Sequence, residues 1–149
     1  MFDAGDYVRK VFSRVTSNER LFMKKEAIYP DTGTKSSAPL SPGIKAGGFI
    51  FVSGQVPVDP KTGEIVEGGI EQQTLQTIEN ISEILKAAGS SLDKVVKCTV
   101  FLTDISEFSR MNEVYSSFFC NVPPARSTIE VSKLAIDIKV EIEAVALVD

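Results

Sequence analysis

The chain of 149 residues contains no histidine. This absence excludes a Ser–His or Cys–His nucleophile pair, a histidine metal ligand and a histidine proton shuttle. The two cysteines, Cys98 and Cys120, are too few for a four-ligand zinc site. Cys98 lies in an apolar run typical of a strand, which favours a buried thiol, and nothing else in the chain indicates a secreted, disulfide-bonded protein.

The chain also lacks an excess of positive charge and a long apolar run. The formal net charge of -4 and the isoelectric point near 5.0 give no electrostatic footprint for nucleic acid. No apolar run approaches the ~18 residues that cross a bilayer. We therefore expect no nucleic-acid partner and no membrane partner. The hydrophobic content of 43% and the charged content of 24% are those of a single globular domain.

Residues 1–25 differ from the rest of the chain. Basic residues lie there among aromatic and branched ones, as in a mitochondrial presequence, namely Arg9, Lys10, Arg14 and Arg20. Three acids, Asp3, Asp6 and Glu19, argue against such a presequence. We expect an N-terminal extension over 1–25, serving as a targeting segment, a surface extension or an extra helix, before one domain over 26–149. A cytoplasmic location is expected, with a mitochondrial one left open.

The order of elements predicts the fold class. Residues 30–48 are rich in Pro, Gly and Ser and predict a loop, followed by a strand from Phe49 to about Ser53 that Gly54 ends. Apolar spacing predicts a helix over 70–88 ended by Gly89, with Leu75 on its buried face. A strand follows over 94–104. Asp104 and Glu107 resemble a capping box that opens a second helix with the buried face Phe108, Met111, Tyr115 and Phe118. Strands over about 125–133 and 139–148 complete an α+β sheet with two helices.

Both faces of this sheet are expected to be apolar. In the last strand Val140, Ile142, Ala144, Ala146 and Val148 alternate with Val145 and Leu147. Phe49 and Phe51 likewise oppose Ile50 and Val52, and Val95, Thr99 and Phe101 oppose Val96, Cys98, Val100 and Leu102. Two helices can cover only one face, so the other would remain a large hydrophobic patch. We therefore predict a homo-oligomer whose sheets face inward.

Two carboxylates lie on that second face of the last strand. Glu141 and Glu143 fall there with a period of two, and Arg126 stands near the start of the preceding strand. A buried carboxylate is costly unless it is paired, hydrogen-bonded or protonated. Glu141 is therefore a candidate functional group, and Glu143 is interpreted as structural or as part of a rim.

Several separate stretches resemble one known family. "FIFVSGQVPVDPKTGEIV", "KVVKCTVFLTDISEF", "MNEVYSSFF", "PPARSTIEV" and "VEIEAVA" resemble, in the same order, motifs of the RidA/YjgF family of imine deaminases. The resemblance implies a chorismate-mutase-like fold of the bacillus type, a six-stranded mixed sheet with two helices on one face. It implies a trimeric barrel with active sites between subunits. It also implies cofactor-free hydrolysis of reactive 2-imino acids, of the 2-aminoacrylate and 2-iminobutanoate class, to 2-keto acids and ammonia.

The resemblance also assigns roles to individual residues. Arg126 in "PPARST" matches the arginine that holds the substrate carboxylate, and Glu141 matches the glutamate that positions or activates water. Ser53 matches a pocket serine, Gly54 the adjacent backbone, and Asn112 a polar pocket residue. No metal or organic cofactor is implied.

Two positions depart from the family pattern. Thr128 stands where many members have a cysteine, so cysteine-modification chemistry does not transfer. Members commonly read Gly-Pro-Tyr-Ser before the strand, whereas this chain has Leu40 in the place of an active-site tyrosine. An apolar wall replaces a phenol, which indicates either bulkier apolar imino acids as substrates or weaker activity.

Other interpretations remain open at this point. Arg126 and Glu141 could pair with one another, or with a neighbouring subunit, and serve only assembly. Ser53 could bond its own backbone, and Asn112 could be an ordinary helix residue. The alternative functions are an endoribonuclease or translation inhibitor, and a non-catalytic trimer that binds 2-keto acids.

Overall fold

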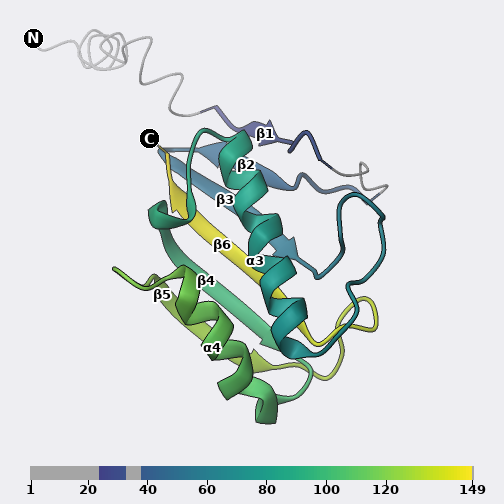
Figure 1. Ribbon diagram of the computed structural model, residues 1–149. Coiled ribbons are helices and arrows are strands. Elements are labelled where there is room, and N and C mark those ends of the chain that lie inside the picture. Colours follow the sequence, from purple (N-terminus) through teal and green to yellow (C-terminus); the bar gives the residue numbers. More distant parts are fainter. Residues whose placement is uncertain (1–23, 33–37, 149) are drawn as a thin grey trace, which may run out of the picture.

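The computed structural model describes residues 24–32 and 38–148, which form one mixed sheet with both α-helices on one face (Figure 1). The strands are β1 (Glu26–Ile28), β2 (Gly43–Ala46), β3 (Phe49–Gln55), β4 (Val95–Leu102), β5 (Ala125–Glu130) and β6 (Val140–Leu147). The helices are α3 (Ile70–Ala87) and α4 (Phe108–Phe118), with 3-10 turns at Leu92–Lys94 and Ile105–Glu107. The predicted α+β fold, a six-stranded mixed sheet with two helices, is confirmed. The proposed extension over 1–25 lies outside the described residues except for 24 and 25.

Strand order places the C-terminal strand in the middle of the sheet. The order is β1-β2-β3-β6-β4-β5, and every neighbouring pair is antiparallel except β4 and β5, which are parallel. A parallel pair needs a crossover, and α4 supplies it between β4 and β5 (Figure 1). β5 is therefore an edge strand with a helix above it.

The core lies between the sheet and the two helices. The inward positions of β6 are buried, namely Val140, Ile142, Ala144 and Ala146. They meet the buried face of α3, which carries Ile70, Ile78, Ile81, Ile84 and Leu85. The prediction that Leu75 shares this face is wrong, since its side chain is 42% exposed. The helical period instead turns Thr74 and Thr77 inward, and both are fully buried.

The end of α3 agrees with the sequence prediction, whereas the start of α4 does not. Gly89, at φ 75°, ends α3 as predicted, and the Ser90 amide donates to the Leu85 carbonyl at 2.8 Å. The predicted capping box on α4 is wrong. Asp104 Oδ1 accepts from the Ser106 amide at 2.9 Å and caps the 3-10 turn, whereas Glu107 accepts from Lys139 Nζ at 2.9 Å.

The strand boundaries also differ from the sequence expectation. β2 lies in the segment predicted as a loop, and β1 was not foreseen. β3 continues through Gly54 to Gln55, with a register shift after Val52. Another shift, between Val95 and Lys97, reverses the expected facing, so that Val95 is buried and Val96 is 38% exposed. β5 and β6 are shorter than predicted.

The sheet face opposite the helices is uncovered in the single chain. Large apolar side chains on the outward positions are more than a third exposed, among them Phe49, Phe51, Val96, Ile129 and Leu147. The expectation that both faces are apolar is thus confirmed, while the homo-oligomer remains a prediction. No helix within the described residues is both long and apolar enough to cross a membrane. The cytoplasmic or mitochondrial location remains a prediction.

Candidate functional site

Arg126 lies on the helix side of the sheet, beneath α4. On the parallel neighbour β4 its partner is Cys98, which is 1% exposed in the core, and paired residues of adjacent strands share a face. The partly buried guanidinium donates from Nη2 to Asn112 Oδ1 at 2.8 Å. Its Cζ atom lies 4.4 Å from the centre of the Tyr115 ring and 5.5 Å from that of Phe108.

One helical face supplies all three contacts to Arg126. Phe108, Asn112 and Tyr115 are spaced by four and three residues, so they lie above one another on the inner side of α4. Burial, together with the adjacent Cys98 thiol, raises the pKa of the Tyr115 hydroxyl well above its usual range. Tyr115 therefore stays neutral and offers its ring rather than a proton. Arg126 has one side stacked and one nitrogen occupied, which leaves other N–H groups for a ligand.

Glu141 lies on the opposite face of the sheet. It alternates in β6 with the buried Val140 and Ile142, and its partner on β4 is the outward-facing Phe101. Burial, and then the charge of Glu143, raises the pKa of the Glu141 carboxyl above its ordinary value. No donor among the described residues forms a hydrogen bond to this carboxylate. A partly buried carboxyl of raised pKa is suited to accept and return a proton.

Gly54 provides the space that the Glu141 side chain occupies. A Cβ atom built on Gly54 would overlap Glu141 Oε1 and would also lie 3.2 Å from its Cγ. The φ of Gly54 is not positive, so the close approach rather than the backbone angle requires glycine here. This juxtaposition ties the end of β3 to the start of β6.

Replacing Gly54 by alanine should therefore displace the Glu141 carboxylate. We expect kcat/KM for the reaction proposed below to fall by about 10²-fold, the scale of a misplaced catalytic group. The unfolding free energy should change by less than about 1 kcal/mol, because the displaced atoms end a flexible side chain. In a double-mutant cycle, Gly54→Ala should add no further loss to Glu141→Ala. Additive losses would show that Gly54 acts independently of this carboxylate.

Ser53 of β3 is hydrogen-bonded to the segment before β2 that carries Leu40. Ser53 Oγ donates to the Ser41 carbonyl at 2.8 Å, and the Ser53 amide donates to Pro42 O at 3.0 Å. The hydroxyl thus bonds the backbone of this loop rather than its own, and it holds the segment that carries Leu40. The Leu40 side chain is 50% exposed and is free to form an apolar wall.

The predicted site residues form two groups in one chain. Thr128 pairs with the core residue Val100, so it shares the helix side with Arg126 and Asn112, and its Oγ1 is buried with no hydrogen-bond partner among the described residues. Glu141 lies against Gly54 on the other face. Along β4, the partners of Arg126 and Glu141 are three residues apart. Arg126 and Glu141 form no ion pair within the chain, so direct pairing inside one subunit is wrong.

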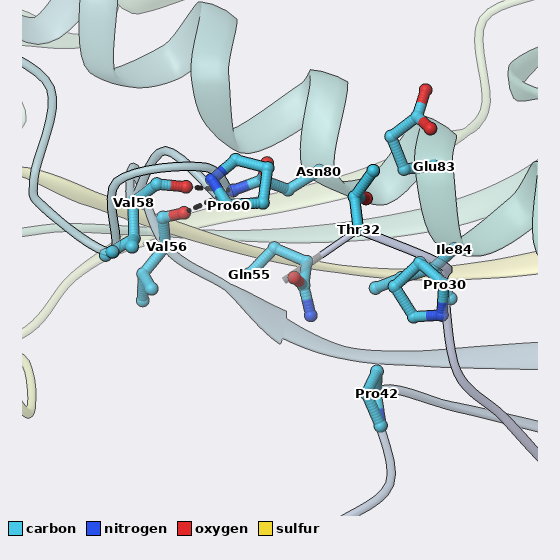
Figure 2. Close-up of a pocket in the computed structure, with 11 residues that line it drawn as sticks. Pro30, Thr32, Pro42, Gln55, Val56, Val58, Pro60, Asn80, Glu83 and Ile84 are labelled. Carbon is cyan, nitrogen blue, oxygen red and sulfur yellow. Dashed lines mark hydrogen bonds between the residues drawn. The ribbon is translucent and has the colours of Figure 1, made fainter. Parts of the chain in front are cut away.

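The cavity in Figure 2 is lined by other residues, one of which is Gln55, the residue that follows Gly54. Its volume is about 190 Å³, and it lies between α3 and the end of β3, beside Pro30, Pro42 and Pro60. Asn80 Nδ2 donates to the carbonyls of Val56 and Val58 at 3.0 and 2.9 Å, as the dashed lines show. None of the predicted site residues lines it. Its polar contacts fix the loop that leaves β3.

A second hollow lies on the open sheet face near the Glu141 strand. It measures about 180 Å³ and is lined by side chains that include Phe51, Lys97, Thr99 and Glu143. Within residues 24–32 and 38–148, no group of three or more cysteine or acidic side chains could hold a metal ion. Sequence reasoning missed Phe108 and Tyr115 as neighbours of Arg126, although their spacing around Asn112 was a usable signal.

The chain resembles known proteins over most of its length. Residues 32–148 match the family model described as Endoribonuclease L-PSP. A RutC family protein of Pyrococcus horikoshii is 52% identical over 122 residues, which cover 82% of this chain and 97% of that protein. The chloroplastic Reactive Intermediate Deaminase A of Arabidopsis thaliana is 40% identical over 124 residues, covering 83% and 66% respectively. The crystal structure of E. coli TdcF with bound serine matches with a TM-score of 0.78 and 38% identity, covering 83% of this chain and 99% of that one.

Proposed function

Because the chain belongs to the RidA/YjgF family, which includes reactive intermediate deaminases, we propose that it hydrolyses 2-imino acids to 2-keto acids and ammonia. The substrates proposed are of the 2-aminoacrylate and 2-iminobutanoate class, and the active form proposed is a homotrimer. One observation carries the proposal. A guanidinium held in orientation on one face of the sheet is matched by a carboxyl of raised pKa on the other.

Arg126 binds the substrate carboxylate in this mechanism. The planar guanidinium can form two parallel hydrogen bonds to a carboxylate, and it keeps its charge at any working pH. Asn112 and the Tyr115 ring restrict its rotation before the substrate arrives. Fixing the carboxylate fixes the C=N carbon attached to it, which is the atom that water attacks.

Glu141 manages the protons of the hydrolysis. The carboxylate takes a proton from water as the oxygen bonds to the C=N carbon, and the imine nitrogen gains a proton from the solvent, which the later loss of the hydroxyl proton returns. The resulting tetrahedral carbon bears a hydroxyl and an amino group. Glu141 then returns its proton to the nitrogen, the C–N bond breaks and ammonia leaves, while loss of the hydroxyl proton forms the keto group. The raised pKa of the Glu141 carboxyl brings it closer to the pH at which both transfers are efficient.

Two copies of the chain are needed to complete such a site. Arg126 and Glu141 lie on opposite faces of one sheet, so a substrate held by the first cannot reach the second of the same copy. The uncovered face that carries Glu141 is apolar, with Phe49, Phe51 and Leu147 more than a third exposed, which favours its burial against another copy. A cleft between subunits would bring Arg126 of one copy to Glu141 of the next.

Two of the related proteins support the chemistry. The Arabidopsis relative is named as a reactive intermediate deaminase, and TdcF was solved with serine, a small amino acid that carries a carboxylate. Leu40 is the observation that favours one alternative function. Where the family commonly has a phenol, its half-exposed apolar side chain also suits a trimer that binds 2-keto acids without turnover. An endoribonuclease is disfavoured by the net charge of -4 and the absence of histidine.

A trapping assay tests the deaminase directly. An amino-acid oxidase generates the imino acid in place, semicarbazide traps what remains, and the protein should lower the trapped fraction. With imines of small amino acids, Leu40→Tyr should raise the rate, by about tenfold if the added phenol contributes one hydrogen bond in the transition state. Leu40→Phe, which adds a ring without a hydroxyl, is the matched control. Trapping that is unchanged by the wild-type protein for small and bulky imino acids alike would reject the proposal.

A further inference from the structure

The surroundings of Arg126 contain more than a hydrogen-bond partner. The centre of the Tyr115 ring lies 4.4 Å from Cζ of the guanidinium. The Tyr115 ring also contacts the Phe119 ring, and the two ring centres are 4.6 Å apart. Tyr115 is 4% exposed and Phe119 is 7% exposed. Tyr115 thus links Arg126 on the edge strand β5 to the aromatic core.

Arginine on an edge strand would otherwise have considerable freedom. A free arginine side chain loses rotamer entropy when it is fixed, so a clamp that is ordered in advance binds more tightly. A cation over an aromatic face is attracted by the ring, most strongly where water is excluded.

The hydrogen bond to Asn112 completes the restraint. It holds Nη2 at 2.8 Å from Asn112 Oδ1, while the Tyr115 ring holds the centre of the guanidinium at 4.4 Å. Phe108 lies at 5.5 Å and adds a weaker contact. Neither restraint alone defines an orientation, whereas the two together do.

We propose that Tyr115 is a positioning residue for substrate binding, which acts by stacking its ring on Arg126 so that the guanidinium presents its free N–H groups to a 2-oxo- or 2-imino-carboxylate. The inference rests on the proposed function, since it assumes that Arg126 is the clamp. It assigns no proton transfer to Tyr115. Only the ring matters, so Tyr115→Phe should behave as the wild type does.

Binding of pyruvate, the simplest 2-keto acid product of this class, tests the proposal without turnover. The full chain and the variants Tyr115→Leu, Tyr115→Phe, Phe119→Leu and Arg126→Ala are titrated by calorimetry at one ionic strength. Phe119→Leu is the matched control, because it removes a buried aromatic ring beside Tyr115 and leaves in place the ring that contacts Arg126. We expect Tyr115→Leu to raise the Kd for pyruvate by about tenfold, with Tyr115→Phe and Phe119→Leu within about threefold of wild type.

Steady-state kinetics separates positioning from a general loss of structure. The carboxylate is gripped equally in the substrate and in the transition state, so Tyr115→Leu should raise KM by a similar factor and leave kcat within about threefold. If Tyr115→Leu does not fold, Tyr115→Met carries the test, since its flexible side chain fills more of the space without a ring, and the same rise in Kd of about tenfold is expected.

The outcomes distinguish this inference from the proposed function. If Arg126→Ala abolishes pyruvate binding but Tyr115→Leu and Phe119→Leu shift the Kd equally, Arg126 remains the clamp and the positioning role is overturned. An unchanged Kd in Tyr115→Met, where that variant carries the test, overturns it as well. If the wild type does not bind pyruvate, or Arg126→Ala binds it as well as the wild type does, the clamp itself fails and the inference falls with it.

Discussion

Replacing Arg126 by alanine is expected to lower kcat/KM for 2-imino acids by about 10²–10⁴-fold, the share that orientation of a bound reactant commonly supplies. The loss follows from the geometry of the clamp. The stacked, hydrogen-bonded guanidinium is the one cation on the inner side of β5, so its removal leaves no group there for the substrate carboxylate. The measurement is the semicarbazide trapping assay over a range of imine concentrations.

Two variants serve as controls for Arg126→Ala. One removes another arginine, on the neighbouring helix α4, and the other keeps the positive charge at position 126. Arg110 of α4 pairs with Glu71 through Nε and Nη2 at 2.6 and 2.8 Å, on the outside of the fold. Arg110→Ala should lower activity by less than about twofold, because exposed pairs contribute little. Arg126→Lys keeps the charge but loses the planar fork, and it should retain only a small part of the activity. Activity that survives in Arg126→Ala would remove this side chain from the site.

The sequence predicts a helix or strand correctly where the residues of that element alone carry the pattern. The period of the apolar residues predicted α3, and Gly89 predicted its end. The alternation of β6 predicted which side chains meet the helices. Positions that depend on a partner strand were harder. The facing of Val95 and Val96 is set by a register shift against β6, and a shift of one residue exchanges the two faces.

Short strands depend on pairing in the same way. β1 and β2 have three and four residues, too few to show a period, and they exist because β3 offers an edge to which β2 can pair. The turn between β2 and β3 uses Gly47 and Gly48, both at positive φ, in a segment whose glycines predicted only a loop. Composition alone does not distinguish a hairpin turn from a connecting loop.

The candidate site shows a similar division. The strand pattern already singles out Glu141, whereas the roles of Arg126, Ser53, Gly54, Asn112, Leu40 and Thr128 come from the family resemblance. Their division between the two faces needed the register of β4 with both β5 and β6. The role of Gly54 depends on its close approach to Glu141 in the folded chain, and a strand pattern does not show how closely a distant glutamate approaches. The function of Asn112 depends on the hydrogen bond that it accepts from Arg126.

A mixture of two inactive variants should recover activity. Arg126→Ala and Glu141→Ala each lack one half of the proposed site, and each keeps the half that the other lacks. If every site takes Arg126 from one copy and Glu141 from the next, random mixing in equal amounts restores roughly a quarter of the sites, since each of two independent positions is intact half the time. The variants are unfolded together, refolded, and assayed against each variant refolded alone.

The same mixture separates a shared site from a site within one chain. When both groups belong to a single copy, no mixed assembly contains an intact pair, and the mixture stays as inactive as its components. The variant Arg126→Ala/Glu141→Ala is the matched control, because mixing it with either single variant rebuilds no site in either arrangement. Recovery with the single variants but not with the double variant would require adjacent copies to share the site. Its absence in a mixture shown by mass spectrometry to contain mixed oligomers would contradict that arrangement. The physical reason for expecting recovery is the sheet itself, which lies between Arg126 and Glu141 and forms a barrier that neither side chain can cross.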